Sequence, residues 1–140
     1  MCPHPEQTVP RIFAAIDDRR FDDLRGLYTE NVRGRTVLGE ISGVSDVVAT
    51  LRRVHEPIAA FQHLVSGLVV ALDGSAATVR ANVVAVFCDA QRNPVFEGAS
   101  IWRGRLHRDA DGWRVAEFTM ELVWSRATVA PAAGAGSAGQ

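Results

Sequence analysis

One histidine interrupts a long apolar segment of this chain. His63 stands in FQHLVSGLVVALD, where Val, Leu, Phe and Ala supply most of the other side chains. Histidine changes charge near neutral pH, so in an apolar surrounding it is a candidate proton donor or acceptor. Asp17 is the candidate partner. It follows Phe13 by four residues, at the edge of the apolar face of a predicted first helix.

Such a pair has a defined chemistry. A carboxylate that binds one ring nitrogen fixes the tautomer of the imidazole and raises its basicity. The other nitrogen can then exchange a proton with a substrate in a dry cavity. The pair suits proton abstraction next to a carbonyl, loss of water or ring closure, and none of these reactions needs a cofactor. The alternative is a structural histidine in the core, with Asp17 capping a backbone amide.

The elements that must position the pair are helices followed by strands. Residues 61–89 read as two strands joined at Asp73-Gly74, a dipeptide typical of tight hairpin turns. We expect helices from Thr8, from Asp22 or Asp23, and from a Ser45 cap to Pro57, with a short strand over 32–38. Further strands are expected at 95–106 and 113–124. Helices first and antiparallel strands afterwards predict an α+β fold.

The strand over 81–88 is apolar on both faces. One parity contains Ala81, Val83, Ala85 and Phe87, and the other contains Asn82, Val84, Val86 and Cys88. Helices can cover one face, so the other needs different cover. We therefore predict a homodimer through the outer sheet face, against the alternative of a monomer with an Ala- and Val-rich surface.

Composition narrows the class of protein. The chain has 140 residues, 47% of them hydrophobic and 22% charged, with a net charge of −1. We expect one compact domain over 8–126, a flexible N-terminus over 1–7 and a disordered Ala/Gly-rich tail over 127–140. No signal peptide or membrane span is visible, and two cysteines make a disulfide framework improbable, so we expect a cytoplasmic protein.

Two further binding classes are not expected. The densest basic group, Arg103, Arg105 and Arg108, is interpreted as a solvated strand edge, so no nucleic-acid partner is predicted. His4, His55 and His107 have no partner at ligand spacing, so no metal site is predicted.

The chain resembles a known family at three places. The segments IFAAIDDRRFDDLRGLYTENV, FQHLVSGLVVALDGSAATVRANVVAVF and DGWRVAEF are similar to the SnoaL-like polyketide cyclase and scytalone dehydratase-like branch of the NTF2-like superfamily. The resemblance covers about residues 9–126. It implies a curved mixed or antiparallel sheet wrapped around about three N-terminal helices, with a cone-shaped cavity between them.

The resemblance also implies site residues. Asp17 and His63 match the family's helix-1 aspartate and the histidine that opens the hairpin, and these two are the predicted catalytic residues. Ile16 and Thr36 stand in place of family tyrosines, and Cys88 replaces a second histidine, so the full dehydratase set is absent. The predicted substrate-binding residues are Phe13, Tyr28, Thr36, Asn82, Cys88, Trp102, Phe118 and Met120.

We therefore expect a cofactor-independent cyclase, dehydratase or isomerase acting on a hydrophobic polyketide- or terpenoid-like molecule. Two alternatives stay open: a non-catalytic small-molecule-binding or assembly module, and an epoxide hydrolase. The first alternative differs from the enzyme in one observable, namely whether Asp17 and His63 face a common cavity of about 300 Å³ or more.

Overall fold

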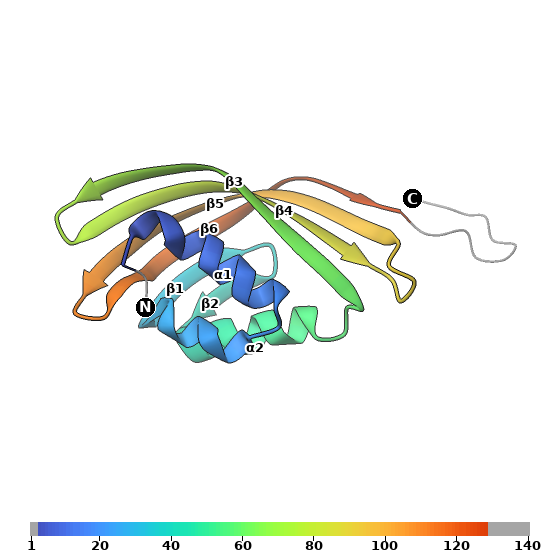
Figure 1. The fold of residues 1–140 in the computed structure, drawn as a ribbon, viewed down its shortest axis with the longest axis horizontal. Helices are drawn as coiled ribbons and strands as arrows, with labels where there is room; N and C mark the ends of the chain where they lie inside the picture. The colour runs from blue at the N-terminus through green and yellow to red at the C-terminus, as the bar shows by residue number, and fades with distance from the viewer. Residues whose placement is uncertain (1–2, 129–140) are drawn as a thin grey trace, which may run out of the picture.

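The computed structural model describes residues 3–128 and contains one mixed sheet with helices on one side (Figure 1). The helical segments are the 3-10 turn η1 (Pro5–Gln7), helix α1 (Thr8–Asp17), the 3-10 helix η2 (Phe21–Gly26) and helix α2 (Val44–His55). The strands are β1 (Tyr28–Thr36), β2 (Gly39–Ser42), β3 (Ala60–Asp73), β4 (Ala76–Cys88), β5 (Pro94–Asp109) and β6 (Gly112–Ala127). The α+β class and the curved sheet predicted from sequence are confirmed.

The six strands lie in the order β2-β1-β6-β5-β4-β3. Only β1 and β6 are parallel, and every other neighbouring pair is antiparallel. Figure 1 shows the sheet arching over α1 and α2, which both lie under its concave side. The long strands therefore leave an inner face toward the helices and an outer face away from them.

Each helix is held by one apolar face. Val9, Ile12, Phe13 and Ile16 of α1 are all buried, as their helical spacing predicts. In the second helical segment, the buried residues Phe21 and Leu24 anchor a six-residue 3-10 helix that ends at Gly26. Helix α2 begins after Gly43, whose positive φ of 92° and missing side chain replace the expected Ser45 cap.

The hairpin predicted over 61–89 is present as β3 and β4. Gly74 adopts the positive φ of 62° that the tight turn requires. The register of β3 shifts between Ser66 and Val69, where Gly67 also has a positive φ, so β3 contains a bulge that bends the strand.

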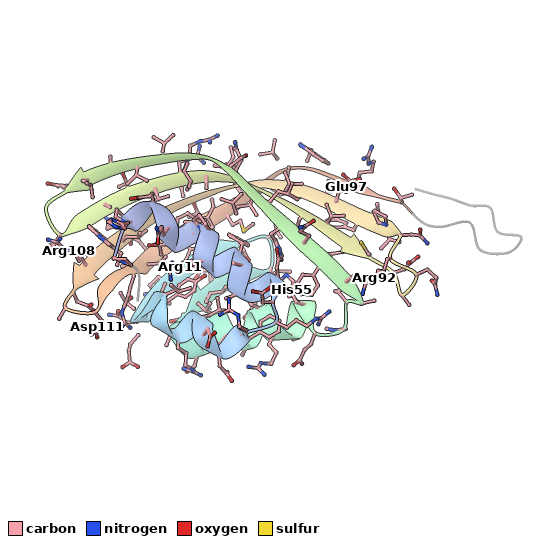
Figure 2. The ribbon with its side chains drawn as sticks, in the orientation of Figure 1. Arg11, His55, Arg92, Glu97, Arg108 and Asp111 are labelled. Carbon is pink, nitrogen blue, oxygen red and sulfur yellow. The ribbon has the colours of Figure 1, made fainter. Side chains whose placement is uncertain are left out.

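Alternation along β4 separates the two faces. Ala77, Val79, Ala81 and Val83 are buried on the inner face. Asn82, Val84, Val86 and Cys88 have the opposite parity and lie on the outer face. Glu97 lies opposite Val86, and Figure 2 shows it on the outer side of the sheet.

Some boundaries differ from the sequence predictions. The first strand begins at Tyr28 rather than Val32, and the region predicted as a turn near Gly39 is the short strand β2. Within the predicted flexible N-terminus, residues 5–7 form η1, and Pro5 is buried against the domain. The predicted disordered tail lies outside the described residues, except for Ala127 in β6 and Thr128. Among residues 3–128, no helix has the length and apolar composition to cross a membrane.

Candidate active site

The end of α1 and the beginning of β3 meet on the inner face of the sheet. Asp17 is the last residue of α1, and His63 is the fourth residue of β3. His63 lies opposite Ala85 of β4, on the parity that faces the helices. The amphipathic pattern of α1 and the alternation of β3 together place these two side chains at one point.

Asp17 holds His63 by two hydrogen bonds. The Nδ1 atom of His63 lies 2.7 Å from Asp17 Oδ1, and the backbone N–H of His63 donates to Asp17 Oδ2 at 2.9 Å. The imidazole is only 4% exposed and the carboxylate is 22% exposed. With Asp17 ionised, the short ring contact requires a proton on Nδ1, and in the neutral form of the ring Nε2 then carries the lone pair.

The position of Asp17 is electrostatically unfavourable without its partners. A carboxylate at the C-terminus of a helix faces the negative end of the helix dipole. The two donors of His63 compensate this repulsion by binding both carboxylate oxygens. An acid kept where helix stability does not favour it is typical of a functional position.

The second ring nitrogen of His63 is available to a ligand. Within residues 3–128, Nε2 makes no hydrogen bond to the protein, and it is not among the fully buried polar atoms that lack a partner, which are Thr8 Oγ1, Thr29 Oγ1 and Arg114 Nε. Nε2 therefore keeps contact with accessible space although the ring is almost wholly covered.

Aromatic rings surround the pair. The ring of His63 lies 5.0 Å from that of Phe13, 6.1 Å from that of Phe61 and 6.3 Å from that of Phe87, measured between centroids. Phe96 extends the group, with its ring 5.6 Å from that of Phe87. This apolar shell removes water and strengthens the electrostatic contact between the acid and the imidazole.

His55 is a second imidazole of the site that sequence reasoning missed. Its ring centroid lies 5.3 Å from that of His63, and its Nδ1 lies 2.8 Å from the carbonyl oxygen of Leu51. Figure 2 shows it on the helix side of the sheet. Burial lowers the pKa of His55 and so favours its neutral form. The available signal was its spacing, because Val47, Leu51 and His55 fall on one face of α2.

Arg19 fixes the backbone next to the pair. Its guanidinium donates to the carbonyl oxygens of Ile58 at 2.6 Å and, at 3.4 Å, of His55, Glu56 and Ala59. It also lies over the ring of Phe61, 4.7 Å from the centroid. Arg19 is exposed and still joins the end of α1 to the segment between α2 and β3, and it does so with a positive φ of 58°.

Of the predicted substrate-binding residues, Phe13 contacts His63 directly. Tyr28, Trp102, Phe118 and Met120 lie on the inner face, in a second aromatic group toward β1 and β6. There the ring of Trp102 stacks on that of Phe118 at 5.8 Å, and the ring of Tyr28 lies 5.9 Å from that of Phe118. Burial raises the pKa of Tyr28, so its hydroxyl stays protonated.

The structure does not bring the other three predicted contacts to the pair. Thr36 lies at the turn between β1 and β2, where its hydroxyl accepts a hydrogen bond from the N–H of Leu38. Asn82 and Cys88 lie on the outer face, because they have the parity opposite to Ala81 and Phe87. The prediction used the positions of these residues along the chain, which do not determine the face of the sheet on which a side chain lies.

Two hollows stand out on the described part of the chain, and neither includes Asp17 or His63. One has a volume of about 640 Å³ and lies across the outer face of the sheet. The other, about 460 Å³, lies between α1 and η2 and is lined by polar groups such as Arg11 and Asp22. The imidazole of His63 is instead closely surrounded by the rings of Phe13, Phe61 and Phe87. Among residues 3–128, no three His, Cys, Asp or Glu side chains gather closely enough to hold a metal ion.

Known structures share this fold. A protein from Kribbella flavida has a TM-score of 0.77 at 22% identity, with 86% of this chain and 88% of that one covered. A putative scytalone dehydratase from Novosphingobium aromaticivorans has a TM-score of 0.78 at 14% identity, covering 96% and 92%. A hexachlorocyclohexane dehydrochlorinase has a TM-score of 0.77 at 10% identity, covering 88% and 85%.

A search among curated proteins found no match to the chain. A protein family does match, and over most of the length: the SnoaL-like domain aligns with residues 6–119. This range includes both helices, the whole hairpin and the two residues of the acid–imidazole pair. The chain is therefore a member of the SnoaL-like domain family, within the NTF2-like superfamily.

Proposed function

We propose that this protein is a cofactor-independent acid–base enzyme, a lyase or isomerase, with His63 as the base and Asp17 as the residue that orients it. The observation that carries the proposal is the 2.7 Å contact between His63 Nδ1 and Asp17, made inside an aromatic shell while Nε2 has no hydrogen-bond partner among residues 3–128. A structural core histidine would have both ring nitrogens satisfied or fully covered.

The proposed reaction begins at Nε2. This nitrogen removes a proton from a carbon next to a carbonyl, and the carbonyl takes up the electron pair as an enolate. Asp17 stabilises the imidazolium that forms, since its carboxylate already holds the Nδ1 proton. The proton then returns to a leaving oxygen, which gives loss of water, or to another carbon, which gives isomerisation. Attack of the enolate on a second carbonyl would instead close a ring.

The proposed substrate is a hydrophobic, oxygenated small molecule of polyketide or terpenoid type. Phe13, Phe61 and Phe87 favour a flat apolar molecule beside the imidazole. Two proteins with this fold carry the names of elimination enzymes, a putative scytalone dehydratase and a hexachlorocyclohexane dehydrochlorinase, and these names support an elimination.

Deuterium exchange tests the base without knowledge of the natural substrate. Aromatic ketones and β-hydroxyketones are incubated with the protein in D₂O, and NMR follows exchange at the carbon next to the carbonyl and loss of water. We expect His63→Gln and Asp17→Asn to lower the rate by roughly 10²-fold or more. His107→Gln and Asp18→Asn are matched controls, because both side chains are exposed and neither has a hydrogen bond or ion pair with Asp17 or His63. Wild-type rates in His63→Gln would end the assignment.

A non-catalytic binding module is the second candidate, and one observation favours it. Neither the 640 Å³ hollow nor the 460 Å³ hollow contains the pair, and the side chain of His63 is only 4% exposed. In this reading the same ketones bind, as judged by chemical-shift changes at His63, and no exchange above the uncatalysed rate occurs. An epoxide hydrolase would need a second acid beside the imidazole; among residues 3–128, Asp17 is the one carboxylate hydrogen-bonded to His63.

We also propose a homodimer through the outer face of the sheet. Leu64 is 52% exposed and Trp124 is 46% exposed on that face, and the half-buried Val84 and Ala99 lie between them. Such an apolar surface is typical of an interface. Light scattering after size exclusion should give twice the chain mass for the wild type and one chain mass for Leu64→Glu. A monomeric wild type would contradict the proposal.

A further inference from the structure

One hollow lies on the outer face, away from the acid–imidazole pair. It has a volume of about 640 Å³, within the roughly 300–1,000 Å³ of small-molecule pockets. Strands β1, β3, β4, β5 and β6 form its floor, and β2 borders it at one edge. The polar lining residues are Arg33, Arg35, Glu40, Thr78, Arg80, Arg103, Arg105, Glu117 and Thr119.

Register places the arginines in two rows across the sheet. The first row runs Arg33, Glu117, Arg105, Thr78 and Ala71, from β1 to β3. The second runs Arg35, Thr119, Arg103, Arg80 and Val69. Continued into β2, where Glu40 is paired with Arg35, the second row holds three arginines and one acid, although the chain as a whole has a net charge of −1.

The second row contains an unfavourable contact. Arg80 of β4 lies directly opposite Arg103 of β5, and like charges at opposite positions destabilise a sheet. The acids near the rows relieve little of this repulsion. Arg105 and Glu117 are 3.4 Å apart, Arg103 and Glu121 3.6 Å, and Arg35 and Glu40 4.0 Å, and every one of these side chains is more than half exposed.

The chemistry of the hollow suits an oxyanion. Guanidinium groups present several N–H donors in a plane and bind phosphate or carboxylate oxygens in pairs. The hydroxyls of Thr78 and Thr119 lie beside the arginines and add donors at the floor, where Val69 and Ala71 are small. Strands are about 4.8 Å apart, so neighbouring arginines of one row can contact different charged groups of one compact ligand.

We propose that this arginine hollow, lined by Arg33, Arg35, Arg80, Arg103 and Arg105, binds a small molecule with two or more negative charges, either a phosphate ester or a polycarboxylate. The ligand neutralises the repulsion between Arg80 and Arg103. This site is separate from the proposed catalytic pair, since the sheet itself lies between them, and the inference does not depend on that reaction.

A second chain and a nucleic acid fit the hollow less well. The exposed apolar residues Leu64 and Trp124 lie in one row with Val84 and Ala99, outside the arginine hollow. The apolar surface and the arginine rows therefore occupy different parts of the outer face. Single-stranded nucleic acid is usually held by exposed aromatic rings beside the basic groups. The one aromatic residue of the lining, Phe118, has its side chain buried on the inner face.

Calorimetric titration with inorganic pyrophosphate and with citrate, at constant ionic strength, tests the proposal. We expect saturable binding of at least one of them, and the tighter of the two identifies the ligand as phosphate or carboxylate in type. Arg103→Gln and Arg80→Gln should each weaken binding about tenfold. Arg53→Gln is the matched control, since Arg53 is exposed on α2, and it should bind like the wild type. Thermal unfolding of each variant verifies that it is folded.

Three results would overturn the inference. Absence of saturable binding of both anions is the first, and unchanged affinity in Arg80→Gln and Arg103→Gln is the second. The third is tighter binding of a short single-stranded oligonucleotide than of either small anion. His63→Gln separates this site from the proposed reaction, because it should abolish exchange and leave anion affinity at the wild-type value.

Discussion

The inner and outer faces of the sheet hold charged groups in opposite ways. On the inner face, Asp17 and His63 share two short hydrogen bonds under a cover of phenylalanine rings. On the outer face, five arginines lie on β1, β4 and β5, and three of them pair with exposed acids at 3.4 to 4.0 Å. The same sheet therefore shields one acid–imidazole pair on its inner face and carries exposed arginines on its outer face.

The difference is a matter of solvent. Water and salt screen the arginine rows, so each exposed pair contributes a few tenths of a kcal/mol and its contribution changes with ionic strength. The inner pair is shielded from salt, and its geometry is fixed by two bonds to one carboxylate. Variants on the two faces should therefore differ in size of effect, in sign and in salt dependence.

Removal of the inner acid should give the largest effect. Asp17→Ala leaves the backbone N–H and the Nδ1–H of His63 without an acceptor, and we expect the free energy of unfolding in denaturant to fall by about 3 kcal/mol. The loss should be the same at high and low salt. Asp18→Ala removes a carboxylate that only faces the exposed Arg20, and should change stability by less than about 0.5 kcal/mol. Equal losses in the two variants would refute the special status of Asp17.

Substitution of Arg19 should have the next largest effect on stability. Two variants separate the contribution of its hydrogen bonds from that of its positive φ. Arg19→Ala loses the donors to the carbonyls of Ile58 and its neighbours but keeps the positive φ of 58°, so we expect a loss of about 2 kcal/mol. Arg19→Gly loses the same donors and suits that backbone angle. It should therefore be more stable than Arg19→Ala by about 1 kcal/mol in thermal unfolding. The opposite order would show that the backbone angle is not strained.

His55 should give the inner face a pH dependence. Burial lowers the pKa of His55 below its usual 6.5, so below that pH the unfolded chain binds a proton that the folded protein resists. Stability should therefore be full above pH 6.5 and fall as the pH drops from 6.5 toward the lowered pKa. The free energy of unfolding, measured between about pH 7.5 and about pH 5, should fall less steeply in His55→Gln. Equal pH dependence of the free energy of unfolding in the wild type and in His55→Gln would contradict the assignment of this dependence to His55.

The smallest effect should come from the outer face and have the opposite sign. Arg80→Gln removes the like charge opposite Arg103, and we expect it to raise the free energy of unfolding by about 0.3 kcal/mol at low salt. The gain should vanish at about 0.5 M salt, where the Debye length is only a few ångströms. Arg126→Gln is the contrasting variant, because Arg126 pairs with Glu97 at 2.6 Å and its loss should not stabilise. A salt-independent effect in Arg80→Gln would indicate lost packing instead.

The parts of the fold that were predictable from sequence are those with local signals. The turn at Asp73-Gly74, the apolar strands beside it and the spacing of Val9, Ile12 and Phe13 each act within a few residues. The meeting of Asp17 with His63 was also predictable, because the edge of a helix face and a strand parity limit where each side chain can point.

The rest depended on contacts between distant segments. Arg19 binds backbone carbonyls 36 to 40 residues away. Every residue has a backbone carbonyl, so the sequence does not indicate which of them will accept a hydrogen bond from Arg19. The arginine rows arise only when β1, β4 and β5 are brought into register around β6, so the sequence showed the group at 103–108 as an ordinary strand edge. His55 was missed because its contacts come from Phe61, Phe87 and His63 on other elements.

The place of β6 determines when the molecule can be completed. Strand β6 lies between β1 and β5, so the ribbon of β1 and β2 joins the sheet only through residues 112–127. During synthesis, the hairpin of β3 and β4 can form early, whereas β1 has no neighbour except β2 until residues 112–127 have left the ribosome. Truncation within β6 should therefore yield a chain that exposes β1 and β5 as open edges and aggregates, rather than a smaller version of the same domain.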